Sequence, residues 1–413
     1  MTDARARNGN KAQRSFAILH VLGLLDQNMG GPLRGVLDMS ARADRHGLKT
    51  EILGQGHINI EDNPLLIEAF HCLPAWPAGG FGYSPAVWKW CQKNLHRFDG
   101  VVLHGMWTYQ NWAVSRACQR AGTPYAIFAH GMLEPWSIVG QGRLTRWKKT
   151  AYWNWRERRI FSGARAAFFT TKREMDRSRS TFAVPAIPCH ISPFCPDIRV
   201  ERAVRPERTE LTQQPGTRFA LFLGRVRPNK GPDLLLRAWA LATMPPTWRI
   251  VMAGPVEPGY LTSLKRLAAE LGIASAVHFT GPVAGRDKQY LLGAASWFVL
   301  PSSHENLGVA PIEAILMGCP VALSTEVYVA DLLHRDTVVL PLDPEAWADF
   351  FSGPMQDDAF RHRISDLDHR LSAPRFRIEN AAREWAGLLG QVFPRRETTV
   401  SDDAAADVSG VCH

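Results

Sequence analysis

Short apolar runs alternate with longer segments of helical periodicity along most of the chain. In the first half, these runs predict buried strands at 16–22, 49–53, 100–103, 125–128 and 166–170. In the second half, they predict strands at 219–223, 249–253, 277–280, 297–300 and 320–323. Between them, apolar residues recur at helical spacing and predict helices at 35–46, 110–121, 233–242, 261–271 and 311–317. Repeated strand–helix alternation predicts an α/β protein with two Rossmann-like, doubly wound parallel sheets.

A segment rich in Pro, Glu and Arg separates the two halves and has neither strand nor helix periodicity. We therefore expect a first domain at 15–195, a linker at 196–216 and a second domain at 217–373. The sequence predicts a C-terminal helix at 374–393 that can pack back on the first domain. The polar, small-residue-rich composition of 394–413 predicts a disordered tail. Because parallel sheets bind ligands beyond the carboxyl ends of their strands, two such domains predict a shared cleft.

Composition narrows the class of protein. The 413 residues are 46% hydrophobic and 21% charged, as in soluble globular proteins, and no apolar run is long enough for a membrane span. Basic residues precede the run at 16–22 as in a signal peptide, but no small-residue cleavage site follows, so we expect a buried strand there. The seven cysteines form no CxxC pair, which favours a reducing, cytoplasmic location. The net charge of +9 favours an anionic partner without choosing among nucleic acid, membrane and phosphorylated ligand.

The second domain opens with the sequence "FLGRVRPNKG", in which Arg225 and Lys230 follow a predicted strand and precede a predicted helix. Two cations beside a helix N-terminus suit a diphosphate, although solvated loops also carry Lys and Arg.

A later stretch, "SSHENLGVAPIEAILMGCP", places Glu305 at a strand end and Glu313 one turn into a helix. Between them, Leu307 and Gly308 would present backbone N–H groups toward the cleft. A solvated helix start explains Glu313 equally well, because a carboxylate there interacts favourably with the helix dipole.

The motifs "FLGRVRPNKG", "VMAGP", "VHFTGPV" and "ENLGVAPIEAILMGCPVALST" occur in this order over almost the whole second half. In this combination the chain resembles the family 4 glycosyltransferases, which have the GT-B fold. The resemblance implies that Arg225 and Lys230 neutralise the donor diphosphate, that Glu305 binds the donor sugar, and that Glu313 binds the ribose. It also implies roles for the amides of Leu307 and Gly308 at the diphosphate, and for Gly254 and Val283 near the base.

The first domain carries a matching half of the predicted site. Gly30 and Gly31 stand where the family has a turn near the donor phosphates. "PYAIFAHGMLEPW" ends a strand at His130, which the resemblance places at the donor sugar, near the reacting centre. "VVLHGMW" ends another at His104 and Trp107, which are candidates for the acceptor side, although His104 can equally cap its strand.

The segment "RLTRWKKTAYWNWRERR" at 143–159 mixes basic residues with tryptophans. This composition suits an anionic membrane surface, and it also fits a helix that covers the core or a nucleic-acid contact, for which no recognised motif is present. The motif after His130, together with this segment, resembles bacterial enzymes that build exopolysaccharide or O-antigen chains.

The resemblance therefore implies a retaining glycosyltransferase that moves a sugar from a nucleotide-diphosphate sugar to a glycan, and we expect a lipid-linked acceptor at the cytoplasmic face of the membrane. A nucleotide-sugar epimerase of GT-B shape and a non-catalytic nucleotide-sugar binding protein remain alternatives. Fixed cations and amides can stabilise a leaving diphosphate without a metal. The one D-x-D, Asp366 to Asp368, lies far from these motifs, so we expect it at the surface and expect neither metal nor cofactor.

Overall fold

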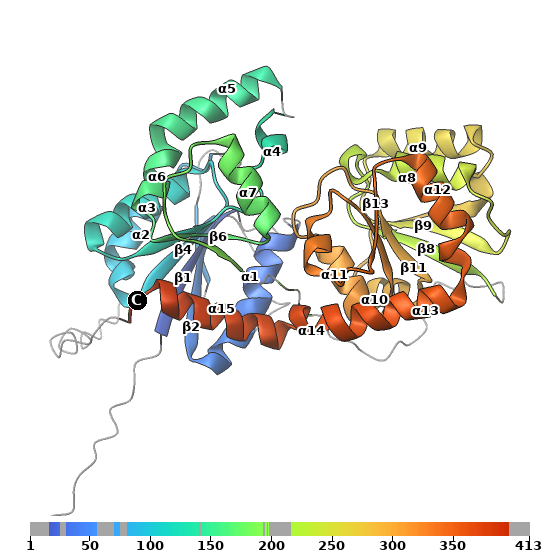
Figure 1. The fold of residues 1–413 in the computed structure, drawn as a ribbon. Helices are drawn as coiled ribbons and strands as arrows, with labels where there is room; N and C mark the ends of the chain where they lie inside the picture. The colour runs from blue at the N-terminus through green and yellow to red at the C-terminus, as the bar shows by residue number, and fades with distance from the viewer. Residues whose placement is uncertain are drawn as a thin grey trace, which may run out of the picture.

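A computed structural model describes residues 16–24, 30–55, 70–74, 81–139, 142–192, 195, 197 and 216–395. Two parallel sheets, each flanked by helices, form the two lobes of the molecule (Figure 1). The first sheet has the strand order β3-β2-β1-β4-β5-β6-β7 and the second has the order β10-β9-β8-β11-β12-β13. Both orders reverse beside the first strand of the sheet, which is the doubly wound arrangement that leaves a binding crevice at the carboxyl ends.

The strands of the first sheet are β1 (Phe16–Leu24), β2 (Leu48–Gln55), β3 (Phe70–Leu73), β4 (Gly100–His104), β5 (Tyr125–Phe128), β6 (Ala166–Phe169) and β7 (Cys189–Ile191). Those of the second are β8 (Arg218–Leu223), β9 (Trp248–Ala253), β10 (Val277–Gly281), β11 (Trp297–Leu300), β12 (Val321–Ser324) and β13 (Val338–Leu340). All ten predicted strands are confirmed, and the short edge strands β3, β7 and β13 were not predicted.

The helices of the first lobe are α1 (Gly30–Ala43), α2 (Pro85–Asn94), α3 (Tyr109–Ala121), α4 (Pro135–Val139), α5 (Arg143–Tyr152), α6 (Arg158–Gly163) and α7 (Lys172–Thr181), with a π-helical turn, η5 (Trp153–Glu157), between α5 and α6. Those of the second are α8 (Pro232–Leu241), α9 (Pro258–Glu270), α10 (Gly285–Ala294), α11 (Val309–Leu316), α12 (Pro344–Ser352) and α13 (Asp358–Leu367). The predicted helix at 35–46 begins earlier, at Gly30, and ends in the turn η1 (Asp44–His46).

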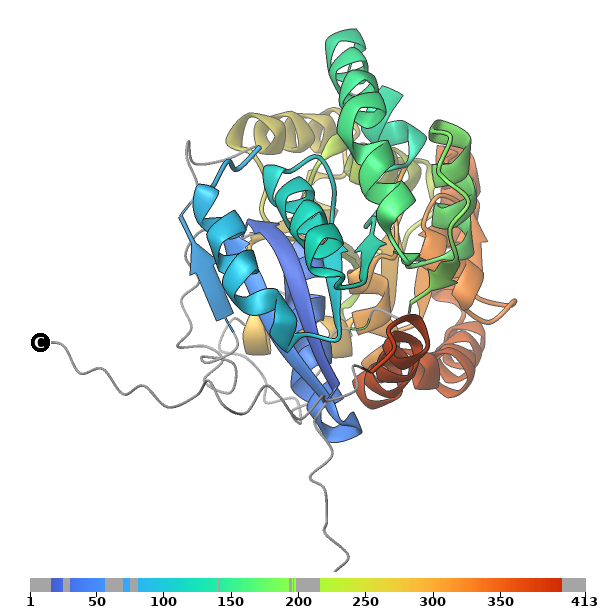
Figure 2. The same cartoon turned by 90° about the vertical axis from the view of Figure 1, so that its left-hand side faces the viewer.

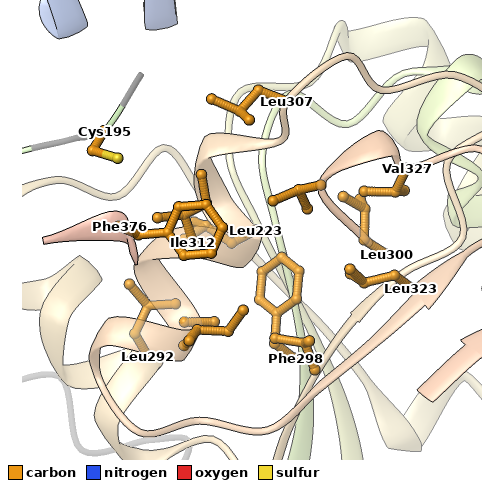
Figure 3. Packing of buried hydrophobic residues seen from close by; sticks show 14 of the residues in the cluster. Cys195, Leu223, Leu292, Phe298, Leu300, Leu307, Ile312, Leu323, Val327 and Phe376 are labelled. Carbon is orange, nitrogen blue, oxygen red and sulfur yellow. The ribbon is translucent and has the colours of Figure 1, made fainter. Parts of the chain in front are cut away.

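The strands are apolar on both faces because helices cover both sides of each sheet. In the second lobe, Ile312 of α11 packs among Leu223 and Phe298 of the sheet and Phe376 of the later helix α14 (Ala373–Phe376) (Figure 3). Burying one such side chain stabilises the fold by roughly 1.5–3 kcal/mol. This packing fixes α11, and with it the loop that carries Glu305 to Gly308.

The last helix, α15 (Ile378–Val392), crosses back to the first lobe and lies along α1 (Figure 1). Trp385 of α15 packs against the rings of Phe128 and Phe168 in the first sheet. The carbonyl of Val392 accepts a hydrogen bond from Nε of Arg165. Helix α15 therefore completes the first domain. The expected linker at 196–216 lies almost wholly outside the described residues, as does the expected tail beyond residue 395.

Candidate active site

The loop after β8 is shaped by close backbone approaches. Gly231, with φ of 70°, lies so near the second sheet that a Cβ on it would stand 2.1 Å from the carbonyl oxygen of Pro301. Only glycine fits there, and the preceding 3-10 turn, η7 (Pro228–Lys230), is thereby held against the end of β11. Arg225 is exposed on the same loop, and Lys230 is largely buried.

Lys230 and Glu305 form an ion pair between two loops at the carboxyl edge of the sheet. Burial, followed by the Arg225 guanidinium, lowers the pKa of Lys230 to about 8. The Glu305 carboxylate in contact with it acts in the opposite direction and favours the ammonium form. The two predicted donor residues therefore lie together, as one charged pair with Arg225 nearby.

Backbone pairing holds Glu305 in place. Its amide donates to the carbonyl of Glu326 at 3.0 Å, and its carbonyl accepts from the amide of Tyr328 at 3.1 Å. Gly308, with φ of 74°, is the N-cap of α11 and supplies no side chain to the helix N-terminus. The first amides of α11 are therefore available to an anion, and they follow directly on the predicted phosphate contacts at Leu307 and Gly308.

Glu313 lies on α11 with its side chain nearly buried, and its Oε1 accepts from Nζ of Lys288 in α10 at 2.6 Å. The sequence analysis did not single out Lys288. Gly254 follows β9, and a Cβ on it would lie 1.9 Å from the carbonyl oxygen of Gly224. The ends of β8 and β9 therefore lie side by side, and the amide of Gly254 also donates to Gly281, two residues before Val283.

In the first domain, His130 follows β5 and has φ of 49°, a left-handed conformation that is uncommon for residues other than glycine. Its ring stacks on Phe128 with centroids 4.1 Å apart. Its Nε2 lies 2.8 Å from Nδ1 of His104, whose Nε2 lies 2.7 Å from Nδ1 of His20 in β1. His104 therefore contacts His130 directly, and His20 is a third histidine that the sequence analysis missed.

The structure also shows the surroundings of three further candidate residues, Trp107, Gly30 and Gly31. Trp107, with φ of 68°, donates its backbone N–H to Glu157 at 2.7 Å, and its ring lies against Tyr152 and Phe182. It thus packs against η5 and the neighbouring end of α5. Gly30 and Gly31 form the first turn of α1 instead of a turn before it, so their amides lie at a helix N-terminus.

The two domains touch beside these residues. Oγ1 of Thr170 lies 2.9 Å from Oδ1 of Asn306, the neighbour of Glu305, and also donates to the buried carboxyl of Glu174. The same carboxyl accepts from the amide of Gly131, the neighbour of His130. His130 and Glu305 are thus each one residue away from a single interdomain hydrogen-bond network.

A second buried network joins the domains through Tyr328. Its hydroxyl donates to Oε2 of Glu134 at 2.7 Å and accepts from Arg177 at 2.8 Å. The ring of His304 stands edge-on to Tyr328 and also packs against Trp136 of the first domain. Burial raises the pKa of Glu134 to about 8, which favours its neutral form. No sequence motif pointed to this contact.

The D-x-D segment is only partly at the surface. Asp366 is exposed and pairs with Arg370, whereas Asp368 is buried and accepts from Thr337 at 2.6 Å. The surface prediction is therefore wrong for Asp368, because this carboxylate fixes the start of β13 to the helix beside it. Among the described residues, no cluster of His, Cys, Asp and Glu has the arrangement of a metal site.

Two family models match the chain. One, described as "Glycosyl transferase 4-like domain", matches residues 30–195, and the other, "Glycosyl transferases group 1", matches residues 204–366. The chain belongs to the GT-B glycosyltransferases. It is of the family 4 type that the motifs indicated, and the predicted fold is confirmed by solved structures of similar shape.

One such structure is Anabaena Alr3699/HepE in complex with UDP and glucose, with a TM-score of 0.72 and 18% identity over 91% of this chain and 100% of that one. Another is WaaG, a glycosyltransferase involved in lipopolysaccharide biosynthesis, with a TM-score of 0.65 and 18% identity over 90% of this chain and 99% of that one.

Similar sequences include D-inositol 3-phosphate glycosyltransferases. That of Xylanimonas cellulosilytica is 25% identical over 90% of this chain and 95% of its own length. That of Mycolicibacterium gilvum is 36% identical over 39% of this chain, a match that spans only 37% of the relative. Helices long and apolar enough to cross a bilayer are absent from the described part of the chain.

Proposed function

We propose that the protein is a retaining glycosyltransferase that uses a nucleotide-diphosphate sugar in the synthesis of cell-surface polysaccharide. This proposal rests on one observation: the Lys230–Glu305 ion pair of the second domain and the His130 loop of the first domain lie on either side of the same interdomain contact. An ordinary surface ion pair would not need to face a residue of the other domain. Here the first domain brings the partly buried imidazole of His130 to the edge that carries this ion pair.

The donor would lie along the carboxyl edge of the second sheet. Lys230 and Arg225 face its diphosphate together with the first amides of α11. Glu305 binds hydroxyls of the sugar. Glu313 binds the ribose, and Lys288 orients the Glu313 carboxylate. Cations and amides fixed in advance stabilise the charge that develops on the leaving diphosphate, so the proposed reaction uses neither a metal nor a cofactor.

In the transfer step, the bond between the anomeric carbon and the diphosphate oxygen breaks, and the acceptor hydroxyl oxygen bonds to the same face of that carbon. The acceptor proton passes to an oxygen of the departing diphosphate. Closure of the two domains over the bound substrates would exclude water, which otherwise competes with the acceptor.

The acceptor is proposed to be lipid-linked, with the enzyme at the cytoplasmic face of the membrane. Leu144 and Trp147 of α5 and Trp155 of η5 are 65%, 67% and 57% exposed. Arg143, Arg146, Lys148 and Arg158 surround them in sequence, and α5 projects from the first domain in both views (Figures 1 and 2). Exposed apolar side chains among cations suit an anionic bilayer.

A second acceptor class is an inositol phosphate, which the names of the similar proteins favour. A protein of similar fold has been solved with UDP and glucose, which supports UDP-glucose as the first donor to test. The protein would be incubated with UDP-glucose and other nucleotide sugars, together with either a lipid-linked glycan extract or inositol 3-phosphate, and products identified by mass spectrometry.

Transfer to the lipid-linked extract that Lys230→Met and Glu305→Gln abolish would support the proposal. Transfer to inositol 3-phosphate would support the second acceptor class. An epimerised donor without transfer would indicate the epimerase, and nucleotide-sugar binding with no turnover on either acceptor would indicate a binding protein.

The membrane contact has its own test. Sedimentation with vesicles of anionic lipid would be compared for the wild-type protein, a Leu144→Ser/Trp147→Ser variant, and a Leu241→Ser control. Leu241 is 62% exposed on α8, in the other domain. Equal binding of all three proteins would contradict a role for α5.

A further inference from the structure

Three histidine rings form a continuous hydrogen-bonded chain from the interior of the first domain to the candidate site. Nδ1 of His20 faces Nε2 of His104 at 2.7 Å, and Nδ1 of His104 faces Nε2 of His130 at 2.8 Å. The rings are also stacked, with centroids 5.0 Å and 5.1 Å apart. Each ring comes from a different strand end or strand, β1, β4 and the loop after β5, so adjacent parallel strands align the chain.

All three rings are neutral at neutral pH. His20 and His104 are 2% and 4% exposed, and burial lowers the pKa of His20 and of His130 to about 3. A neutral imidazole carries one proton and therefore offers one donor and one acceptor nitrogen. His104 must accordingly donate to one neighbour and accept from the other, so the two hydrogen bonds run in the same direction along the chain.

The direction of these two hydrogen bonds determines the tautomer of His130 at the outer end of the histidine chain. If His104 donates to His130, Nε2 of His130 is the acceptor and its Nδ1 carries the proton. If His130 donates to His104, Nδ1 of His130 is the unprotonated nitrogen. We propose that His20 and His104 are positioning residues that hold His130 in one tautomer and thereby fix whether its Nδ1 donates to the bound donor sugar or accepts from it. The link to the sugar rests on the proposed function.

The inner end of the histidine chain, at His20, differs from an ordinary packing contact in the core. Nε2 of His20 is buried without a hydrogen-bond partner among the described residues, and it lies at a small cavity lined by Met39, Ser192 and Trp385. A histidine that served packing alone would expose no such atom to a cavity, since an unpaired buried polar atom destabilises the fold. The outer end is also unusual, because His130 adopts the left-handed backbone conformation.

The test reads the tautomer directly. Protein labelled with ¹⁵N-histidine is examined by NMR, in which protonated and unprotonated ring nitrogens have different shifts, and His130→Asn assigns its signals. His20→Leu removes the polar atom, whereas His20→Asn keeps a side-chain amide near the position of Nδ1. Met39→Leu changes the same cavity without touching the chain and is the control.

We expect one His130 tautomer in the wild-type protein, in His20→Asn and in Met39→Leu. In His20→Leu we expect a mixture and a five- to tenfold lower kcat at unchanged donor KM, because one hydrogen bond between neutral groups shifts an equilibrium by about that factor. A single tautomer in His20→Leu with unchanged kcat would overturn the proposal. So would equal populations of both tautomers at His130 in the wild-type protein, whether or not a variant folds.

The spectra require no substrate, so they test the positioning role independently of catalysis. A single, His20-dependent tautomer in a protein that transfers no sugar would count against the proposed function and leave the positioning of His130 intact.

Discussion

Replacing Lys230 by Met is expected to weaken the binding of a nucleoside diphosphate strongly. The Lys230 and Glu305 side chains are 16% and 21% exposed, so their charges are only partly screened by water. At an effective dielectric constant of about 20, a cation about 4 Å from a phosphate contributes about 4 kcal/mol. Loss of one partner from a desolvated charge pair costs about 2–5 kcal/mol in comparable interfaces. We therefore expect Kd for UDP to rise about 30- to 4000-fold.

The pair also predicts a non-additive effect. Without Lys230, the Glu305 carboxylate stands uncompensated beside the diphosphate and repels it. The double variant Lys230→Met/Glu305→Gln is therefore expected to bind UDP about 5- to 30-fold more tightly than Lys230→Met alone, which corresponds to a coupling of about 1–2 kcal/mol. UDP is used without a sugar so that the proposed sugar contact of Glu305 does not enter the comparison.

Isothermal titration calorimetry on the four proteins of this cycle measures the coupling. Lys265→Met serves as the matched control, because Lys265 is an exposed lysine on α9 of the same domain. The control should bind UDP within about twofold of the wild-type protein. If the double variant binds no more tightly than Lys230→Met, the Glu305 carboxylate does not lie close enough to repel the diphosphate, and the placement of the Lys230–Glu305 pair beside the diphosphate is wrong.

Three further predictions concern stability, each measured by urea denaturation. Burial raises the pKa of Glu134 from 4.5 to about 8, so its contribution to the free energy of unfolding is fully present below pH 4.5 and is lost as the pH rises through 8. Glu134→Gln should therefore make the free energy of unfolding depend less on pH. An equal pH dependence in both proteins would contradict this. Gly254→Ala places a Cβ 1.9 Å from the carbonyl oxygen of Gly224 at φ of 141° and should destabilise by at least about 2 kcal/mol, whereas Gly259→Ala in α9 has open space and should not. Trp385→Ala should destabilise by about 3–5 kcal/mol, and a loss below about 1 kcal/mol would show that α15 does not hold the first domain.

The central strands were predictable because continuous apolar runs of four or more residues between helical segments have few alternatives. The strands β3, β7 and β13 lie at or beside the sheet edges, and β7 and β13 have three residues each. Half-exposed segments such as "CHI" carry no apolar run, so tertiary pairing alone defines them.

The donor loop was predictable because its residues are near one another in sequence and carry a family motif. His20 and Lys288 were not, since a single histidine in an apolar strand and a lysine on an amphipathic helix have no distinguishing local pattern. Their roles depend on which strands and helices become neighbours in space. Asp368 was misjudged for the same reason, because Thr337 reaches it from a loop more than thirty residues away in the chain.

The return of α15 to the first domain has a consequence for how the protein is made. Phe393 is fully buried, and its ring fills the space that any side chain at residue 100 would need. Trp385 likewise covers the first sheet from a position that follows the whole second sheet in the sequence. While the ribosome is still synthesising the second domain, the first therefore lacks one of its covering helices and exposes apolar surface. We expect the nascent first domain to depend on chaperones until α15 emerges, and the two domains to become stable together.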